Sequence, residues 1–249
     1  MLLLLLWFGQ VLAQSADGRL PGSAFMGPAT QAMQRDDTQN PAMLWVKGGE
    51  ALWRAPAGTA QKSCAACHGQ AEASMRGVAA RFPAFDAVGK VPVNLGQRIN
   101  LCRSRHQQAP PWKLESDDLL GMESYLALQS RGMAVAPPAD ERLKPFVARG
   151  REQYFARIGQ LNLSCAQCHD QQAGKRLGSA LIPQGHASGY PVYRLEWQGM
   201  GSLQRRLRNC MNGVRALPHA AGAVELVELE LYLAGRGGGM VMEAPGVRP

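Results

Sequence analysis

The chain has 249 residues and a formal net charge of +8, with 46% hydrophobic and 18% charged residues. This length is enough for one or two domains with a sizeable core, and the positive balance excludes a highly acidic surface. Aromatic residues make up only 6% of the chain, so aliphatic side chains or a group that is not an amino acid must fill the core.

The N-terminal segment contains no Lys, Arg, Asp or Glu over residues 1–16, and residues 2–8 form an apolar run. The run is too short to span a bilayer, which needs about 20 apolar residues. With the small residues Ala13 and Ala16 after it, the run predicts a cleaved secretory signal peptide over residues 1–16, although a basic start is missing. A retained membrane anchor is the alternative. We expect no membrane span in the mature form and a location in the bacterial periplasm.

The chain repeats itself in five places. The segment SCAACHG at 63–69 recurs as SCAQCHD at 164–170. The other pairs keep the same order: 47–50 with 149–152, 82–83 with 190–191, 95–102 with 203–210, and 125–132 with 232–237. This order predicts the internal duplication of a unit of about 100 residues. The Pro-rich segment 134–140 is the expected seam, which gives an N-terminal unit over 17–136 and a C-terminal unit over 137–249.

Both units are predicted to be mainly helical. A helix over 42–53 leads into the first Cys-x-x-Cys-His motif, and a helix over 145–158 leads into the second. Closing helices follow, one with Ser116 as its N-cap and one over 224–233. Strand signals are weak. A helix before the motif, long loops and a closing helix predict two tandem domains with the class I cytochrome c fold.

The two Cys-x-x-Cys-His motifs carry the chemistry. Their thiols lie one helical turn apart and can form thioethers with the two vinyl groups of a haem, while the imidazole binds the iron from one face. Disulfides or a thioredoxin-like pair are the alternatives, and the histidine in both copies and the export signal disfavour them. We therefore predict two covalently bound c-type haems, held by these residues: Cys64, Cys67 and His68 in the first unit, and Cys165, Cys168 and His169 in the second.

The second iron ligand is often a methionine, which raises the haem potential. The chain has 11 methionines, but Met200 and Met211 have no counterparts in the first unit. Cys102 and Cys210 instead occupy matched positions in the two repeats. We predict that both are distal iron ligands; a disulfide between the units, or two buried thiols, is the alternative.

Arginines accompany both cysteines. Arg98 and Arg206 precede Cys102 and Cys210 by four residues, which places each pair on one face of a helix. A guanidinium there favours thiolate and can hold an anion. Neutralisation of a haem propionate by these arginines is an equal alternative. Arg215, five residues after Cys210, could also interact with the cysteine or with a propionate. The remaining histidines are expected at the surface or in hydrogen bonds rather than on a metal: His106, His186 and His219.

The segment RLRNCMNGVRA at 206–216, followed by ELELYLA at 228–234 and EAPGVR at 243–248, resembles the SoxA family. These are dihaem cytochrome c subunits of the SoxAX complex in sulfur-oxidising bacteria. The resemblance covers nearly all of the mature chain. The segment 217–223 departs from the family, because its residues are smaller and richer in Ala and Gly. The resemblance therefore does not predict the rim of the cleft that would receive a carrier protein.

The family implies an L-cysteine S-thiosulfotransferase, which joins thiosulfate oxidatively to the cysteine of a SoxYZ carrier protein. Electrons pass to a monohaem SoxX-like subunit and then to a soluble cytochrome c. Carried over by position, Cys210 is the active-site cysteine and distal ligand of the second haem, often modified to a persulfide, and Arg206 binds substrate.

Three other functions fit the two motifs: a plain dihaem electron-transfer protein, a tetrathionate-forming thiosulfate dehydrogenase and a cytochrome c peroxidase. Distal methionines would favour the first and an open distal site the third. The moderately basic charge suits small sulfur oxyanions and an acidic partner better than nucleic acid.

Overall fold

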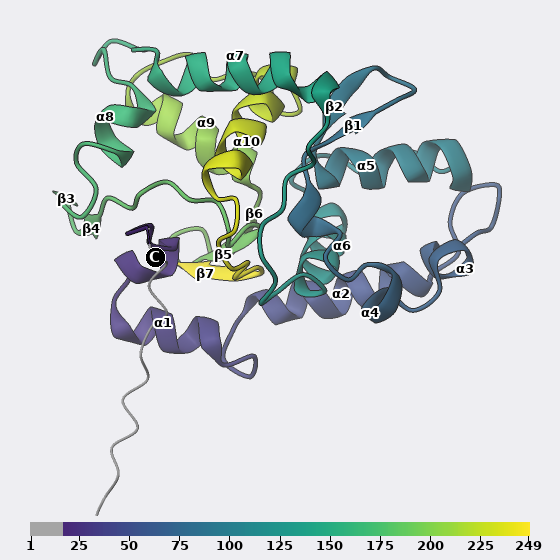
Figure 1. The fold of residues 1–249 in the computed structure, drawn as a ribbon. Helices are drawn as coiled ribbons and strands as arrows, with labels where there is room; N and C mark the ends of the chain where they lie inside the picture. The colour runs from purple at the N-terminus through teal and green to yellow at the C-terminus, as the bar shows by residue number, and fades with distance from the viewer. Residues whose placement is uncertain (1–16) are drawn as a thin grey trace, which may run out of the picture.

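The computed structural model describes residues 17–249, so the predicted signal peptide lies outside the described residues. The fold is mainly helical (Figure 1). The α-helices are α1 (Pro28–Arg35), α2 (Ala42–Arg54), α3 (Cys64–His68), α4 (Ala71–Ser74), α5 (Leu95–Cys102), α6 (Asp117–Leu128), α7 (Lys144–Phe155), α8 (Cys165–His169), α9 (Leu203–Gly213) and α10 (Val224–Arg236). Short 3-10 turns cover Gly22–Phe25, Ala79–Arg81 and Glu141–Leu143, and a π turn, Arg103–Gln107, continues α5.

Within residues 17–249, seven short strands complete the fold, although the sequence showed only weak strand signals. They are β1 (Ala84–Asp86), β2 (Val91–Val93), β3 (Arg176–Leu177), β4 (Ala180–Leu181), β5 (Val192–Arg194), β6 (Gly199–Gly201) and β7 (Gly246–Arg248). Consecutive strands form three antiparallel hairpins, and β7 joins β5 in parallel. Strands of two or three residues are too short to show an alternating pattern, which explains why the sequence did not reveal them.

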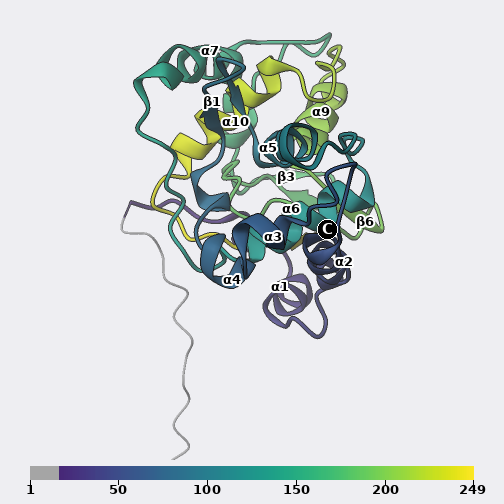
Figure 2. The ribbon, with the colours of Figure 1, turned by 90° about the vertical axis from the view of Figure 1, so that its right-hand side faces the viewer.

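Two pairs of packed helices organise the molecule, α2 with α6 and α7 with α10 (Figure 1). Each pair has its own hydrophobic core. The first core contains Val46, Trp53, Ala71, Ile99, Leu119, Met122, Tyr125 and Leu126. The second contains Tyr154, Ala166, Met211, Leu226, Leu229 and Leu233. Figure 2 looks nearly along α5 and shows α3 and α4 side by side below it.

The helix ends agree with most of the predictions. Ser116 is the N-cap of α6, since its hydroxyl accepts a hydrogen bond from the backbone N–H of Leu119. α7 is shorter than predicted and ends at Phe155, because Ile158 pairs with Leu163 in an isolated β-bridge. α10 is longer than predicted and continues to Arg236.

A glycine allows the helices of each pair to approach closely. A Cβ atom at Gly49 on α2 would overlap the carbonyl oxygen of Gly121 on α6, and one at Gly150 on α7 would overlap that of Glu228 on α10. Gly49 and Gly150 are therefore structurally equivalent. The predicted pairing of 47–50 with 149–152 set Gly48 opposite Gly150 and is wrong by one residue. The consecutive glycines 48 and 49 allowed either register in the sequence.

We expect Gly49→Ala to destabilise the protein by about 1–3 kcal/mol, because the added methyl group must force two helix backbones apart. Gly48→Ala is the matched control, since nothing lies within 4 Å of a Cβ atom at that position. It is expected to stabilise the helix by up to about 1 kcal/mol. Thermal unfolding followed by circular dichroism distinguishes the two; equal midpoints would contradict this packing.

The N-terminal residues of the described chain pack on the second half. The backbone N–H of Leu20 donates to Oε1 of Gln184 at 2.7 Å, and that of Val247 donates to Oε1 of Gln34 at 3.0 Å. α1 consequently lies beside β7, at the far end of the chain (Figure 1).

The Pro-rich segment between the halves is fixed by both of them. The N–H of Val135 donates to the carbonyl oxygen of Met240 at 2.8 Å, and the N–H of Ala136 donates to that of Ala80 at 2.9 Å. This segment is thus an ordered part of the seam rather than a free linker.

A cavity of about 130 Å³ lies at the seam and is lined by both halves. It contains two carboxyl groups at repeat-equivalent positions, Glu123 on α6 and Glu230 on α10. Nδ2 of Asn94 donates to Glu230 at 3.2 Å. Burial and the neighbouring Glu115 and Glu230 carboxylates raise the pKa of Glu123 to about 8, and burial raises that of Glu230 to about 7. The seam therefore favours protonated acids near neutral pH.

Candidate functional site

Each Cys-x-x-Cys-His motif forms a short helix with a serine N-cap. The hydroxyl of Ser63 accepts from the N–H of Ala66 at 3.0 Å, and that of Ser164 accepts from Gln167 at 3.2 Å. α3 and α8 therefore begin at the first cysteine and end at the histidine of each motif. This geometry places the two thiols of a motif one turn apart on one side of the helix.

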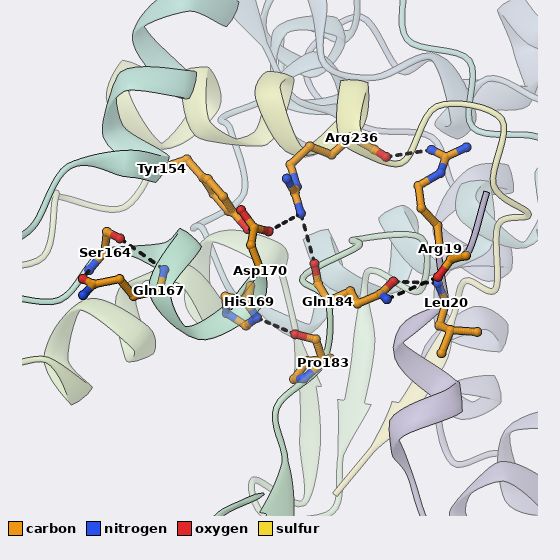
Figure 3. A network of polar contacts seen from close by, with 11 residues as sticks. Arg19, Leu20, Tyr154, Ser164, Gln167, His169, Asp170, Pro183, Gln184 and Arg236 are labelled. Carbon is orange, nitrogen blue, oxygen red and sulfur yellow. Dashed lines mark hydrogen bonds and ion pairs between the residues drawn. The ribbon is translucent and has the colours of Figure 1, made fainter. Parts of the chain in front are cut away.

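An aromatic residue of the preceding long helix anchors the end of each motif. Nε1 of Trp53 on α2 donates to the carbonyl oxygen of Gly69 at 3.0 Å. At the matching place, the hydroxyl of Tyr154 on α7 donates to Oδ1 of Asp170 at 2.8 Å (Figure 3). The two motifs thus have corresponding surroundings in the two halves.

His169 is oriented as a metal-ligating histidine. Its Nδ1 lies 2.8 Å from the carbonyl oxygen of Pro183 (Figure 3), a contact that requires a proton on Nδ1. Nε2 is then left as the nitrogen that can bind a metal. The same ring forms a hydrogen bond with the Cys210 thiol. The structure therefore brings together His169 and Cys210, the predicted axial pair of the second half.

A polar network holds the loop that carries Pro183. Asp170 accepts from Nη2 of Arg236 at 2.7 Å, and this guanidinium also donates to the carbonyl oxygen of Gln184 at 3.4 Å (Figure 3). The network ties the end of α8, the 183–186 loop and α10 together. It fixes the position of the Pro183 carbonyl and thereby the orientation of His169.

His186 differs from its prediction as a surface or hydrogen-bonded residue. The residue is only 9% exposed, and its Nδ1 has no hydrogen-bond partner among the described residues. It lines a second cavity, of about 340 Å³, together with His169, Asp170 and Arg236. Burial and the charge of Arg236 lower the pKa of His186 to about 4, so the ring is neutral at pH 7.

The Cys210 thiol is placed in a cationic environment. α9 carries Arg206 and Cys210 one turn apart, as predicted. Burial raises the pKa of Cys210, but the hydrogen bond from His169 and the charges of Arg206, His169 and Arg194 together lower it by more. The pKa of this thiol consequently lies below its ordinary value, which favours the thiolate that serves as nucleophile and metal ligand.

The corresponding cysteine of the first half has a different environment. Burial and the nearby Asp86 and Cys67 raise the pKa of Cys102 by more than Arg98 and Arg105 lower it. Nη1 and Nη2 of Arg105 each donate to a carboxylate oxygen of Asp86 at 2.7 Å, and Nη1 of Arg98 lies 3.2 Å from the same carboxylate. Both cations beside Cys102 are therefore paired with one almost fully buried carboxylate, which offsets one of their two charges.

His68 lies at the surface of the first half. Its side chain is exposed, and its ring lies 5.8 Å from that of Trp53. Cys102 lies near the two thiols of the motif, Cys64 and Cys67, rather than in a described polar contact with His68. The first half thus brings its three cysteines together.

The structure also places the other sulfur atoms that could take part in the site. All six cysteines are free thiols, so the disulfide between the units is absent from the structure. Met211 is buried in the second core, and Met200 is buried against Leu120 and Ala42. Both methionines are packing residues. Arg194, whose charge lowers the pKa of Cys210, was not predicted as a site residue. An alignment of 82–102 with 190–210 would have shown that Arg194 and Asp86 occupy equivalent positions in the two halves.

The residues of the two motifs fit a c-type haem. Such a group needs two thiols at i and i+3, a histidine with a free ring nitrogen and, where iron is six-coordinate, a second ligand. The second half supplies all of these, with Nδ1 of His169 held by Pro183 and a thiol favoured as thiolate at Cys210. The first half supplies the same residue types.

Comparison with known proteins agrees with this site. The model of the family described as SoxA/TsdA, cytochrome c domain, matches residues 48–135, so this part of the chain, which contains the first motif, is a cytochrome c domain and implies c-type haem. The L-cysteine S-thiosulfotransferase subunit SoxA of Pseudaminobacter salicylatoxidans is 38% identical over 93% of this chain and 82% of its own length. That of Rhodovulum sulfidophilum is 38% identical over 95% of this chain and 83% of its own length.

The fold is also similar to that of a solved structure of the same family. The crystal structure of SoxXA from P. pantotrophus matches with a TM-score of 0.89 and 37% identity, over 93% of this chain and 87% of that chain. The chain belongs to the SoxA family and is an L-cysteine S-thiosulfotransferase subunit. Among the described residues, no helix has the length and apolar character needed to cross a membrane.

Proposed function

We propose that the protein is a periplasmic dihaem cytochrome c that conjugates thiosulfate to the cysteine of a SoxYZ-like carrier protein, in a heterodimer with a SoxX-like monohaem cytochrome. The observation that carries the proposal is the arrangement at Cys210, where His169 and Arg206 act on one buried thiol whose pKa is lowered. The SoxA relatives and the SoxXA structure support the same assignment.

The proposed architecture is two tandem class I cytochrome c domains related by duplication, over 17–136 and 137–249. The matched helix pairs, N-capped motif helices and hairpins support it. In the first domain, Cys64 and Cys67 would hold one haem covalently, and His68 and Cys102 would bind its iron. In the second domain, the corresponding residues are Cys165, Cys168, His169 and Cys210.

The haem of the second domain supplies one-electron redox chemistry beside the reacting sulfur when it is bound. The residues of the chain bind and orient the substrate: Arg206 holds the sulfonate of thiosulfate by charge-assisted hydrogen bonds, and its outer sulfur meets the Cys210 sulfur. The charges of Arg206 and Arg194 favour the deprotonated form of this sulfur before reaction.

The proposed reaction has two balanced steps. A sulfur–sulfur bond forms between the Cys210 thiolate and the outer sulfur of thiosulfate, and two electrons leave toward the SoxX-like cytochrome and a soluble cytochrome c. The carrier thiolate then attacks the outer sulfur, the bond to Cys210 breaks, and the Cys210 thiolate is regenerated. The carrier keeps the thiosulfonate, and no further oxidant is needed in the second step.

The haem content is tested by the mass of the denatured holoprotein, since thioether links survive denaturation. We expect the mass of the chain plus two haems. The double substitution Cys64→Ala and Cys67→Ala should leave one haem, and a wild-type mass with a single haem would contradict the dihaem assignment.

The transfer activity is tested on the purified holo-complex with its SoxX-like partner. The complex is incubated with thiosulfate, an oxidised cytochrome c and a SoxYZ-like carrier, and the carrier is then weighed. We expect a mass increase of one thiosulfonate group on its cysteine. No mass increase would contradict the proposed function. Formation of tetrathionate without carrier would instead identify a thiosulfate dehydrogenase, and haem reduction with neither product would identify a plain electron-transfer protein.

A further inference from the structure

The two halves differ in the charge that faces the cysteine-bearing helix. Residues 82–102 align with 190–210 without a gap, and β1 and β5 begin at equivalent positions. The last residue of β1 is Asp86, whereas the last residue of β5 is Arg194. The two halves therefore have the same fold at this position, but the charge of the side chain is negative in the first half and positive in the second.

In the first half, the carboxylate at this position, Asp86, forms ion pairs with the nearby arginines. Asp86 is 3% exposed at its side chain and lies 3.2 Å from Arg98 and 2.7 Å from Arg105. A bidentate Arg–carboxylate pair satisfies the guanidinium and leaves little attraction for a further anion. Arg105 lies in the π turn after α5, where the first half has one residue more than the second, and residues 211–214 of the second half contain no arginine.

In the second half, the equivalent position adds a cation. The Arg194 side chain is 14% exposed, and one of its terminal nitrogens lies 3.0 Å from Glu196, a side chain that is 65% exposed. Its Nε is buried and has no hydrogen-bond partner among the described residues. Arg194 and Arg206 act electrostatically on each other and on Cys210, and Arg206 forms no ion pair in the described part of the chain. The two guanidinium groups thus act on the same thiol, and Arg194 keeps a buried donor without a partner among the described residues.

A second replacement adds a polar group to the same site. Phe82 corresponds to Tyr190, so an apolar ring in the first half is a phenol in the second. Tyr190 acts electrostatically on Arg194, Arg206 and Cys210. Two like charges at close range repel each other, and a bound dianion removes this penalty.

We propose that Arg194, together with Arg206 and Tyr190, forms a binding site for the sulfonate of thiosulfate beside Cys210, and that Arg194 is the residue that restricts substrate to the second half. This inference rests on the proposed function and adds a substrate-binding residue to it. The two guanidinium groups match the two negative charges of thiosulfate, and their forks match its sulfonate oxygens. The Asp86 carboxylate excludes the same anion from Cys102.

The test measures thiosulfate binding to the fully reduced holo-complex, which has no oxidant and cannot turn over, by calorimetry at fixed ionic strength. Arg194→Gln should raise the Kd for thiosulfate by about tenfold or more. Arg194→Lys should recover part of the loss, because the charge returns without the fork. Tyr190→Phe, which installs the residue of the first half, should weaken binding by several fold. Each variant should keep the haem absorption spectrum of the wild type.

Arg205→Gln is the matched control. Arg205 lies next to Arg206 on α9 and stacks on Trp197 at 4.1 Å, as Arg194 does at 5.0 Å, and the substitution removes the same charge. It should leave the Kd for thiosulfate nearly unchanged. Equal effects of Arg194→Gln and Arg205→Gln would overturn the inference, because general charge would then explain both.

A haem propionate is the competing anion for Arg194, and the haem midpoint potential distinguishes it. If Arg194→Gln shifts the potential and leaves the Kd for thiosulfate unchanged, Arg194 serves the propionate and the inference is wrong. The carrier assay separates this outcome from failure of the proposed function. Unchanged transfer and unchanged KM for thiosulfate in Arg194→Gln refute only the inference, whereas a wild-type complex that binds thiosulfate through Arg194 but modifies no carrier refutes only the proposed function.

Discussion

Substitution of Cys210 by alanine is expected to reduce thiosulfate transfer to the carrier by at least about 10³-fold, because the residue that forms the covalent bond to substrate is lost. The thiol is buried beside His169 and Arg206, and the lowered pKa favours its reactive form. The rate is measured as thiosulfonated carrier per unit time by mass spectrometry, with the holo-complex and saturating thiosulfate.

The same substitution at Cys102 is the matched control, since it removes a thiol from the equivalent position of the other half. Transfer is expected to continue in Cys102→Ala, because both cations there are already paired with the Asp86 carboxylate and the pKa of the thiol is raised. Both variants are checked for retained haem by their absorption spectra. If Cys102→Ala stops transfer and Cys210→Ala does not, the two sites have been assigned the wrong way round.

The second large effect concerns stability at the seam between the halves. Glu123→Gln is expected to stabilise the protein by about 3 kcal/mol at pH 8.5 and by little at pH 5. Burial raises the pKa of Glu123 to about 8 from 4.5. The folded state therefore holds a proton that the unfolded state releases above pH 4.5, and wild-type stability falls as the pH rises from about 5 to 8. The neutral amide removes this dependence.

Chemical unfolding of the holoprotein followed by circular dichroism at several pH values measures the effect. Glu152→Gln, which removes an exposed carboxylate on α7, is the control and should keep the wild-type pH profile. Glu230→Gln should give a smaller gain, because the pKa of Glu230 is raised only to about 7 and Asn94 donates to its carboxylate. Parallel pH profiles for wild type and Glu123→Gln would show that Glu123 is not a buried acid.

The sequence predicted the parts of the fold that have a strong local pattern. The motif helices, the N-cap Ser116 and the helices before and after each motif depend on residues near in the chain, and the structure confirms them. The ends of α7 and α10, the three-residue strands and the one-residue error at Gly49 depend on contacts with distant segments. Such contacts leave no periodic signal in the chain.

The site shows the same division. The spacing of Arg206 and Cys210 on one helix was enough to predict that the guanidinium lies near the thiol, and the Arg206 charge does lower the pKa of Cys210. Arg194 comes from β5, outside the helix that carries Cys210, so no helical spacing predicts that its charge acts on the thiol. His186 was assigned to the surface or to hydrogen bonds because a lone histidine carries no pattern, whereas the folding of the 183–186 loop over α8 buries it.

The most direct test of the proposed function is to find where thiosulfate is attached before it reaches the carrier. The oxidised holo-complex is mixed with thiosulfate labelled at its outer sulfur, without carrier, and then digested without reductant. We predict that the label is found on the peptide that contains Cys210 and that it is lost when carrier is added. Label on the Cys102 peptide, or on neither cysteine while the carrier is still modified, would contradict covalent transfer through Cys210.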